Sequence, residues 1–235
     1  MTKFIIEKDF WELFPDTQIG IVLAKGIDNT GESSAEVKDM LAKANQESRK
    51  FLQEPIFSEN PVVSVWRQAY RKFKTKKGAR SSIENLMKRV EKGKEVGSIN
   101  PLVDIYNTMS LTYGLPAGGE DIDSFAGNLR LTQAQGGEKF IALGDEEPDN
   151  ALAGEIAYLD DEGAVCRCWN WRDGQRTMLT ENTKNAFLII ECVDSSRTDE
   201  LREAIEKLAE LTVAHLGGRA ELAIMTKENP ELSLD

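Results

Sequence analysis

The fold class is indicated by two short apolar runs, Glu155-Ile156-Ala157-Tyr158-Leu159 and Ala164-Val165-Cys166-Arg167-Cys168-Trp169, which the turn residues Asp160-Asp161-Glu162-Gly163 join. Runs of β-branched and aromatic residues bounded by turn residues are typical of strands. Further short runs of this kind occur at residues 129–132, 139–143 and 186–191, with turn residues between them. Together these five runs predict an antiparallel sheet region.

Segments with helical spacing surround this region. We expect helices over residues 34–51, 82–90, 102–113 and 198–216, one more helix that carries Trp66, Tyr70 and Phe73, and further strands over residues 3–7, 18–24 and 219–225. Helices and strands come in blocks rather than in strict alternation, so we predict the α+β class, with mostly antiparallel sheets and helices packed on them. No internal repeat or low-complexity linker divides the chain, so residues 1–235 are expected to form a single domain.

The composition is that of a globular protein. The chain has 235 residues, of which 40% are hydrophobic, and a net charge of -11. No apolar run approaches the roughly 20 residues that a membrane span needs. The first nine residues include several charged ones and lack the apolar core of a signal peptide. We therefore expect a cytoplasmic protein without a membrane partner.

The numbers and positions of histidine and cysteine limit which catalytic and metal-binding sites the chain could form. The only histidine is His215, so a Ser-His-Asp triad, a Cys-His pair or a multi-histidine metal site would all have to use it. It ends a helical pattern, where a histidine is expected to cap or pack the helix. Cys166 and Cys168 lie two apart and fit neither a disulfide framework nor a zinc cage. We predict no metal and no cofactor.

One segment is strongly basic although the protein is acidic. Residues 67–94 carry a net charge of +9, which leaves -20 for the remainder. Trp66, Tyr70 and Phe73 are spaced i, i+4, i+7 and are expected to form a buried stripe. The basic side chains fit two alternatives, a contact with a polyanion or a solvated helix face.

Polar residues of interest gather in three places. Asn100, Asp104 and Asn107 share one helical face, where Asn100 could instead cap the helix and the other two could bond nearby backbone. Gly118-Gly119 follows Pro116 and predicts a loop that presents backbone N–H groups. Residues 169–183 hold two indoles, two guanidiniums and several hydroxyls in one irregular connection, which is typical of a binding loop.

Four motifs between residues 98 and 188 carry a family resemblance. They are Ser98-Ile99-Asn100-Pro101-Leu102-Val103-Asp104-Ile105-Tyr106-Asn107, then Gly114-Leu115-Pro116, then Asp160-Asp161-Glu162-Gly163, and Leu179-Thr180-Glu181-Asn182-Thr183-Lys184-Asn185-Ala186-Phe187-Leu188. Together they resemble the B3/B4 domain of the bacterial phenylalanyl-tRNA synthetase beta subunit, best over residues 81–191 and more loosely elsewhere. Nothing resembles the other modules of that synthetase. The resemblance implies a freestanding B3/B4 protein and not a complete synthetase.

In the synthetase, this domain hydrolyses a wrongly attached amino acid, typically tyrosine, from the tRNA for phenylalanine. The resemblance therefore implies an aminoacyl-tRNA deacylase that acts in trans on the aminoacylated 3′ end of a tRNA. Its expected ligands are the tRNA and the amino acid moiety.

Two departures from the family pattern bear on specificity. The family sequence Pro-Met-His-Ala-Phe-Asp is Pro116-Ala117-Gly118-Gly119-Glu120-Asp121 here, so the editing-site histidine falls on Gly118. The family's Gly-Gly-Glu, whose carboxylate binds the tyrosine hydroxyl, falls near Asp173-Gly174-Gln175, so Gln175 replaces that acid. Trp169 and Trp171 would share a face on an alternating strand and narrow the pocket, unless both pack in the sheet core. These departures predict hydrolysis of several non-aromatic aminoacyl groups.

The expected site residues follow from these motifs. Because an aminoacyl ester is already activated, a positioned water and oxyanion donors could suffice without a nucleophilic side chain. Gly118 and Gly119 would hold the oxyanion, while Asn100 and Thr180 would orient the water. The expected substrate-binding residues are Asp104, Asn107, Glu120, Trp169, Trp171, Arg172, Gln175 and Thr177, with Arg172 on the ribose or the substrate carbonyl.

Two other functional classes stay open. The missing histidine favours a non-catalytic module that binds tRNA or a free amino acid, and a small-molecule hydrolase that ignores RNA is the third class. The net charge of -11 argues against tight nucleic-acid binding in general, whereas the basic segment could supply a local track. The expected tRNA-binding residues are Arg71, Lys72, Lys74, Lys76, Lys77 and Arg80.

Overall fold

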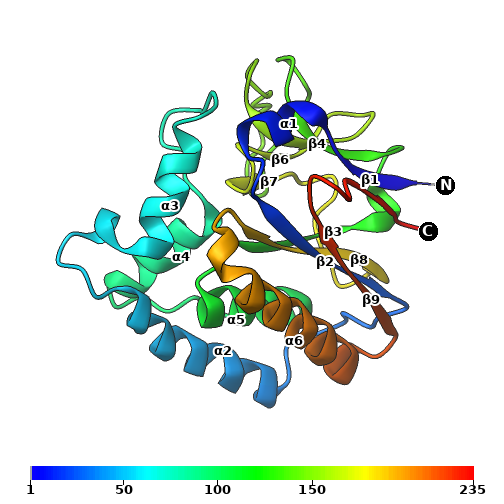
Figure 1. The fold of residues 1–235 in the computed structure, drawn as a ribbon. Coiled ribbons are helices and arrows are strands. Elements are labelled where there is room, and N and C mark those ends of the chain that lie inside the picture. The colour runs from blue at the N-terminus through cyan, green and yellow to red at the C-terminus, as the bar shows by residue number, and fades with distance from the viewer. Residues whose placement is uncertain (1) are drawn as a thin grey trace.

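Two β-sheets pack against each other at the centre of the computed structural model, which describes residues 2–235 (Figure 1). The larger sheet has six strands in the order β10 (Glu231–Ser233), β1 (Lys3–Ile6), β4 (Leu129–Gln133), β5 (Ile156–Leu159), β6 (Ala164–Arg167) and β7 (Arg172–Asp173). Its strands pair antiparallel except β1 and β4, which run parallel. Three of the five short strands that the sequence predicted, β4, β5 and β6, thus lie in this sheet.

The smaller sheet has four antiparallel strands in the order β3 (Ala117–Asp121), β8 (Asn185–Cys192), β2 (Gln18–Lys25) and β9 (Arg219–Met225). Successive side chains of a strand point to opposite faces, and both central strands are apolar on both faces. Ile19 and Ile21 of β2 belong to the core between the two sheets, whereas Val22 and Ala24 belong to the core under the helices. The smaller sheet is therefore the middle layer of the protein.

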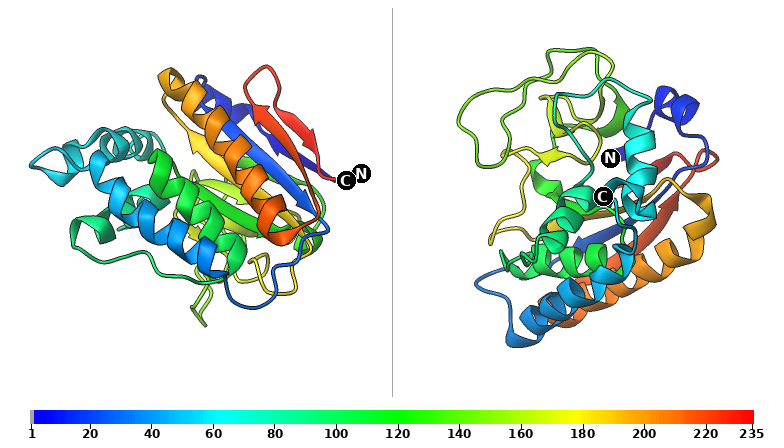
Figure 2. Two further views of the ribbon diagram at one scale, coloured as in Figure 1. Left: turned by 90° about the horizontal axis from the view of Figure 1, so that it is seen from below. Right: turned by 90° about the vertical axis from the view of Figure 1, so that its left-hand side faces the viewer.

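Three helices cover the outer face of the smaller sheet: α2 (Ala35–Glu47), α5 (Pro101–Tyr113) and α6 (Thr198–Leu216). Figure 2 shows them side by side, with α5 between α2 and α6. Asn100 caps α5, Pro101 occupies its first position, and Gly114 ends it in the left-handed conformation at φ 61°. The bounds of α6 are those that the sequence predicted, and His215 lies in its last turn.

The remaining helices lie beside the core between the sheets: α1 (Lys8–Leu13), α3 (Pro61–Tyr70) and α4 (Ser82–Glu91). Aromatic rings from these segments surround Trp169. Phe14 lies 4.7 Å and Trp66 4.9 Å from Trp169, measured between ring centroids. Trp66 and Tyr70 are buried, and Phe73 packs against the same core, so the predicted aromatic stripe is confirmed as core.

The structure confirms the α+β class and corrects four local predictions. Residues 139–143 form no strand and contribute only a bridge from Ala142 to Gly174. Gly118-Gly119 belongs to β3 and not to a loop, because β3 pairs with β8 along its length. Helix α3 ends at Tyr70, before Phe73. Trp169 follows β6 in a turn at φ 65°, so it does not share a strand face with Trp171.

No helix within residues 2–235 is long and apolar enough to cross a membrane.

Candidate functional site

A small cavity lies between the two sheets, and we call it the inner cavity. Its walls come from β3, β4, β5, β6, β7 and β8, from the turn at residues 169–171, and from Ser82 at the start of α4. Its volume is about 70 Å³. A buried water occupies roughly 10–15 Å³ on this measure, so the inner cavity has room for a few waters or one small chemical group.

Glu120 on β3 is the most unusual residue of the inner cavity. Its side chain is only 6% exposed, and its Oε2 atom is buried without a hydrogen-bond partner among residues 2–235. Burial, the negative charge of Asp173 and that of Asp121 raise the pKa of Glu120 well above its usual value, and the nearby Thr177 hydroxyl and Arg176 offset part of this shift. A buried carboxyl without a partner costs folding free energy, so its place on a cavity wall is typical of a functional group.

Two further carboxyls line the inner cavity. Asp173 on β7 lies opposite Cys166 of β6, and burial raises its pKa. Burial also raises the pKa of Glu191 on β8 to about 7, although three donors oppose this shift. Glu191 accepts hydrogen bonds from the Tyr158 hydroxyl, from Trp169 Nε1 at 2.7 Å and from Asn170 Nδ2. Glu191 is therefore held firmly, whereas Glu120 has one buried oxygen without a hydrogen-bond partner among residues 2–235.

The backbone of β3 limits which glycine can donate a hydrogen bond at the sheet edge. The N–H group of Asp121 donates to the Thr177 carbonyl at 2.8 Å, away from β8. N–H groups two residues apart in a strand point the same way, so the Gly119 N–H also points away from β8 and the Gly118 N–H points toward it. A Cβ atom at Gly118 would meet only Ile189 Cγ2, at 3.8 Å, so the wall beside Gly118 is open.

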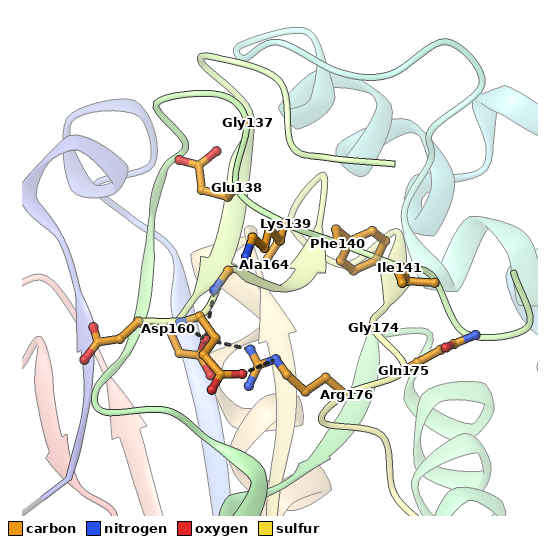
Figure 3. A pocket seen from close by; sticks show the side chains of 13 residues that line it. Gly137, Glu138, Lys139, Phe140, Ile141, Asp160, Ala164, Gly174, Gln175 and Arg176 are labelled. Atoms are coloured by element: carbon orange, nitrogen blue, oxygen red, sulfur yellow. Dashed lines mark hydrogen bonds and ion pairs between the residues drawn. The ribbon is translucent and has the colours of Figure 1, made fainter. Parts of the chain in front are cut away.

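A wider depression, the outer cleft, lies between residues 137–141, residues 160–164 and residues 174–176 (Figure 3). It is far larger, at about 980 Å³, but its central carboxylate is already satisfied. Asp160 accepts hydrogen bonds from the backbone N–H groups of Ala126, Glu162 and Gly163 and from Arg176 Nη2 at 2.6 Å. We therefore regard the inner cavity as the candidate functional site.

A groove rich in basic residues, the basic groove, adjoins the inner cavity. Its walls include Arg67, Arg71 and Arg80. Asn170 connects the two sites. It lines the inner cavity, and its Oδ1 atom accepts a hydrogen bond at 3.1 Å from the hydroxyl of Tyr70, which lines the basic groove. The same Oδ1 atom accepts a second hydrogen bond from the Ser82 N–H at 3.2 Å. Asn170 and its bonding partners therefore form a wall shared by the basic groove and the inner cavity.

The residues expected to bind tRNA lie in the segment between α3 and α4. Arg71, Lys72, Lys74 and Lys77 are exposed, whereas Arg80 is half-buried. Lys76 is half-buried and forms an ion pair with Asp149. The structure therefore leaves four of these six side chains facing solvent.

Asn100 and Thr180 lie together away from the inner cavity. Asn29 Nδ2 donates to Asn100 Oδ1 at 3.3 Å and to the Thr180 carbonyl at 2.9 Å. Asn100 Oδ1 also accepts from the Val103 N–H at 3.0 Å, which caps α5.

The two expected substrate-binding residues of α5, Asp104 and Asn107, are buried. Asp104 accepts hydrogen bonds from the Ser33 hydroxyl at 2.5 Å, from the Ser98 hydroxyl and from the Ile99 N–H at 2.7 Å. These bonds fix the segment before α5 onto the helix. Asn107 is buried in the same helix.

Of the remaining expected substrate-binding residues, Arg172 and Thr177 line neither the inner cavity nor the outer cleft. Trp169 and Trp171 line the inner cavity, and Thr177 is buried with no hydrogen-bond partner for its hydroxyl among residues 2–235. Arg172 pairs with Asp145 at 2.9 Å. Gln175 lines the outer cleft, where its Nε2 atom donates to the Asp145 carbonyl.

Sequence reasoning missed three residues of the inner cavity: Asn170, Asp173 and Glu191. Glu191 had a usable signal, because it is an acidic residue at the end of the apolar run 186–190. Asp173 and Asn170 lie inside the quoted segment 169–183 and had no feature that set them apart. No group of three or more histidine, cysteine or acidic residues within residues 2–235 could hold a metal ion.

Comparison with known families identifies the fold unit. The family model of the B3/4 domain matches residues 65–214, which is more than half of the chain and includes β3, β6, β7 and β8. The chain belongs to the B3/4 domain family. The walls of the inner cavity thus all fall within the B3/4 match, and β1, β2, β9 and β10 lie outside it.

Curated relatives match part of this chain. The phenylalanine–tRNA ligase beta subunit of Ruegeria pomeroyi is 40% identical over 90 residues, and that of Latilactobacillus sakei is 33% identical over 93 residues. Each match covers 38% of this chain and 11% of the relative, so the chain spans only a small part of the length of these relatives. An N-terminal fragment of the phenylalanyl-tRNA synthetase beta subunit from Pyrococcus horikoshii aligns with 92% of this chain and 49% of that chain, at a TM-score of 0.49 and 13% identity.

Proposed function

We propose that this B3/4 protein is an aminoacyl-tRNA deacylase that acts in trans, in the cytoplasm, on the 3′ end of a mischarged tRNA. The observation that carries the proposal is the position of the inner cavity. It adjoins the basic groove through Asn170, so one ligand could place phosphates in the groove and its terminal group in the cavity. The relatives are named as tRNA ligase subunits, which is consistent with a tRNA ligand.

Charge supports the same arrangement. Phosphate contacts dominate the affinity of nucleic-acid binding, and the exposed Arg71, Lys72, Lys74 and Lys77 supply positive charge in an otherwise acidic protein. Under this proposal, the acceptor strand lies along residues 71–80 and the aminoacyl group enters between the sheets.

The proposed chemistry needs no nucleophilic side chain. Water attacks the carbonyl carbon of the aminoacyl ester and forms a tetrahedral oxyanion. As this intermediate collapses, the bond from the carbonyl carbon to the ribose oxygen breaks, the ribose oxygen takes up the proton that the water has lost, and the free amino acid and a tRNA with a free terminal hydroxyl result. The Gly119 N–H points away from β8, so it is the backbone donor on β3 that we assign to the oxyanion. Gly118 has no side chain, so the space beside it in the inner cavity would stay free for the substrate.

The roles predicted for Arg172 and Gln175 in contacting substrate remain part of this proposal, whereas Asn100 and Thr180 lie away from the inner cavity and are given no part in orienting the water there. Arg172 and Gln175 both bond to Asp145, so they would have to exchange these partners on substrate binding.

The test is single-turnover hydrolysis of tRNAs charged with tyrosine, alanine, isoleucine or lysine. Release of at least one amino acid at ten times the uncatalysed rate is expected. A second candidate function is tRNA or amino acid binding without hydrolysis, which the glycine at position 118 favours because it removes the family's histidine. Salt-dependent tRNA binding without release of any amino acid would support this second function and contradict the deacylase.

A further inference from the structure

We propose that the inner cavity binds a primary ammonium group, which sits between the carboxyl groups of Glu120 and Asp173. This inference deepens the proposed function by naming the chemical class that the cavity accepts. It depends on the proposed function only in taking the inner cavity as the ligand site.

The charge of the inner cavity is the first argument. Glu120, Asp173 and Glu191 all line it, and no lysine or arginine side chain does. Like charges in a small buried space repel each other, and burial in addition raises the pKa of each of the three carboxyls. A cation inside the cavity would offset both costs.

The second argument is the unused hydrogen-bonding capacity of Glu120. Its side chain is 94% buried, and Oε2 accepts no hydrogen bond from residues 2–235. Buried polar atoms in proteins nearly always have a partner, so an exception on a cavity wall points to a ligand that supplies a donor. An ammonium group carries three donors and a positive charge, which match an orphan carboxyl oxygen beside a second carboxyl.

The size and the aromatic walls of the inner cavity also fit an ammonium group. A volume of about 70 Å³ holds an ammonium group with a few carbon atoms. Trp169, Trp171, Tyr158 and Phe187 line the same cavity, and aromatic faces attract cations at close range. A divalent metal ion fits less well, because no cluster of metal-binding side chains occurs in the described part of the chain.

An aminoacyl ester offers two sources of this group, its own α-amino group and the side chain of a basic amino acid. Four amides separate them: lysinamide carries both ammonium groups, norleucinamide only the α-ammonium, N-acetyl-lysinamide only the side-chain ammonium, and N-acetyl-norleucinamide neither. Binding of each to the intact protein is measured by calorimetry, without tRNA.

The expected result is that at least one amide with an ammonium group binds ten times more tightly than N-acetyl-norleucinamide. Whether norleucinamide or N-acetyl-lysinamide binds identifies the source of the cation. Glu120→Gln keeps the shape of the side chain but removes its charge, so it should abolish the preference for amides that carry an ammonium group. Asp173→Asn should do the same, and this second variant keeps the test valid if the first one folds poorly. The control Glu146→Gln removes an exposed carboxylate and should leave the preference intact.

Equal binding of all four amides, or binding of none, would overturn the inference. So would a preference that survives in both cavity variants. These measurements need no hydrolysis, so the two claims can fail separately. If the protein binds ammonium groups but cleaves no ester, this inference stands and the proposed function is contradicted. If it cleaves an ester but shows no preference for ammonium groups, the proposed function stands and this inference is contradicted.

Discussion

The indole N–H of Trp169 donates to Glu191 Oε1 at 2.7 Å, and this hydrogen bond joins the turn after β6 in the larger sheet to β8 in the smaller one. The Tyr158 hydroxyl, from β5, donates to the same oxygen. Two side chains of the larger sheet therefore hold one carboxyl group of the smaller sheet, and the inner cavity lies beside this joint. The spacing of the sheets, and with it the shape of the cavity, depends on these bonds.

The first prediction concerns this joint. Tyr158→Phe removes one donor to the buried Glu191 and should lower the free energy of unfolding by about 1–3 kcal/mol at pH 8, as expected for a lost hydrogen bond to a charged group. The measurement is urea denaturation. Tyr113→Phe is the matched control, because the Tyr113 hydroxyl bonds Glu203 at the surface and its loss should cost under about 0.5 kcal/mol. Equal losses in the two variants would contradict a structural role for the joint.

The second prediction is a pH dependence of stability that Glu120→Gln removes. A carboxyl whose pKa is raised by folding stabilises the protein below its unfolded pKa of about 4.3, and this contribution is lost as pH rises through the folded pKa. The Gln variant should therefore match the natural protein near pH 4.5 and be the more stable one at pH 8, by about 1.4 kcal/mol for each unit of the shift. The titratable groups around Glu120 are Asp173, Asp121, Arg176, Cys166 and Tyr106.

Urea denaturation at several pH values checks this, with the exposed Glu181→Gln as control. A stability difference that stays constant from pH 4.5 to pH 8 would show that Glu120 is already ionised in the folded protein.

The third prediction concerns Arg71, which lines the basic groove, and the exposed Lys77 in the segment between α3 and α4. Reversing both Arg71 and Lys77 to glutamate should weaken tRNA binding at least tenfold and reduce the slope of affinity against salt concentration by about one for each lost phosphate contact. Reversal of Lys43 and Lys207, on α2 and α6, makes the same change in net charge away from the groove and should have a much smaller effect. Similar losses in both double variants would mean that only net charge matters.

The fourth prediction separates capping from catalysis at Asn100. Asn100→Ala removes the N-cap of α5 and should lower stability by about 1 kcal/mol, whereas Asn100→Ser retains a capping oxygen and should lose less. Thermal denaturation checks the cap, and equal losses would contradict it. A role in orienting water would appear separately, as slower ester hydrolysis by the well-folded serine variant.

Local sequence patterns predicted much of the fold, because these patterns can be recognised without knowledge of contacts to residues far away in the sequence. Residues 198–216 show apolar helical spacing, start with Asp199-Glu200 and end before Gly217, and the helix has these bounds. Gly118-Gly119 gave the wrong prediction because glycine has little intrinsic strand preference, and only pairing with β8 makes this segment a strand.

The inner cavity was only partly predictable for the same reason. Gly118, Glu120 and the two tryptophans could be selected from motifs, but the contact of Trp169 with Glu191 joins residues 22 positions apart through a turn at positive φ. The lack of a partner for Glu120 Oε2 is a property of three-dimensional packing, and no sequence pattern indicates it.

Hydrolysis in trans of mischarged tRNA tests the central claim most directly. The purified protein is mixed in excess with tRNAs charged with tyrosine, alanine, isoleucine or lysine, and release of the amino acid is followed over time. We predict that at least one ester is cleaved ten times faster than in buffer, that tyrosine is not the exclusive substrate, and that the Arg71 and Lys77 double reversal slows the reaction. No acceleration for any of the four esters, under conditions where tRNA binding is measurable, would contradict the proposed deacylase.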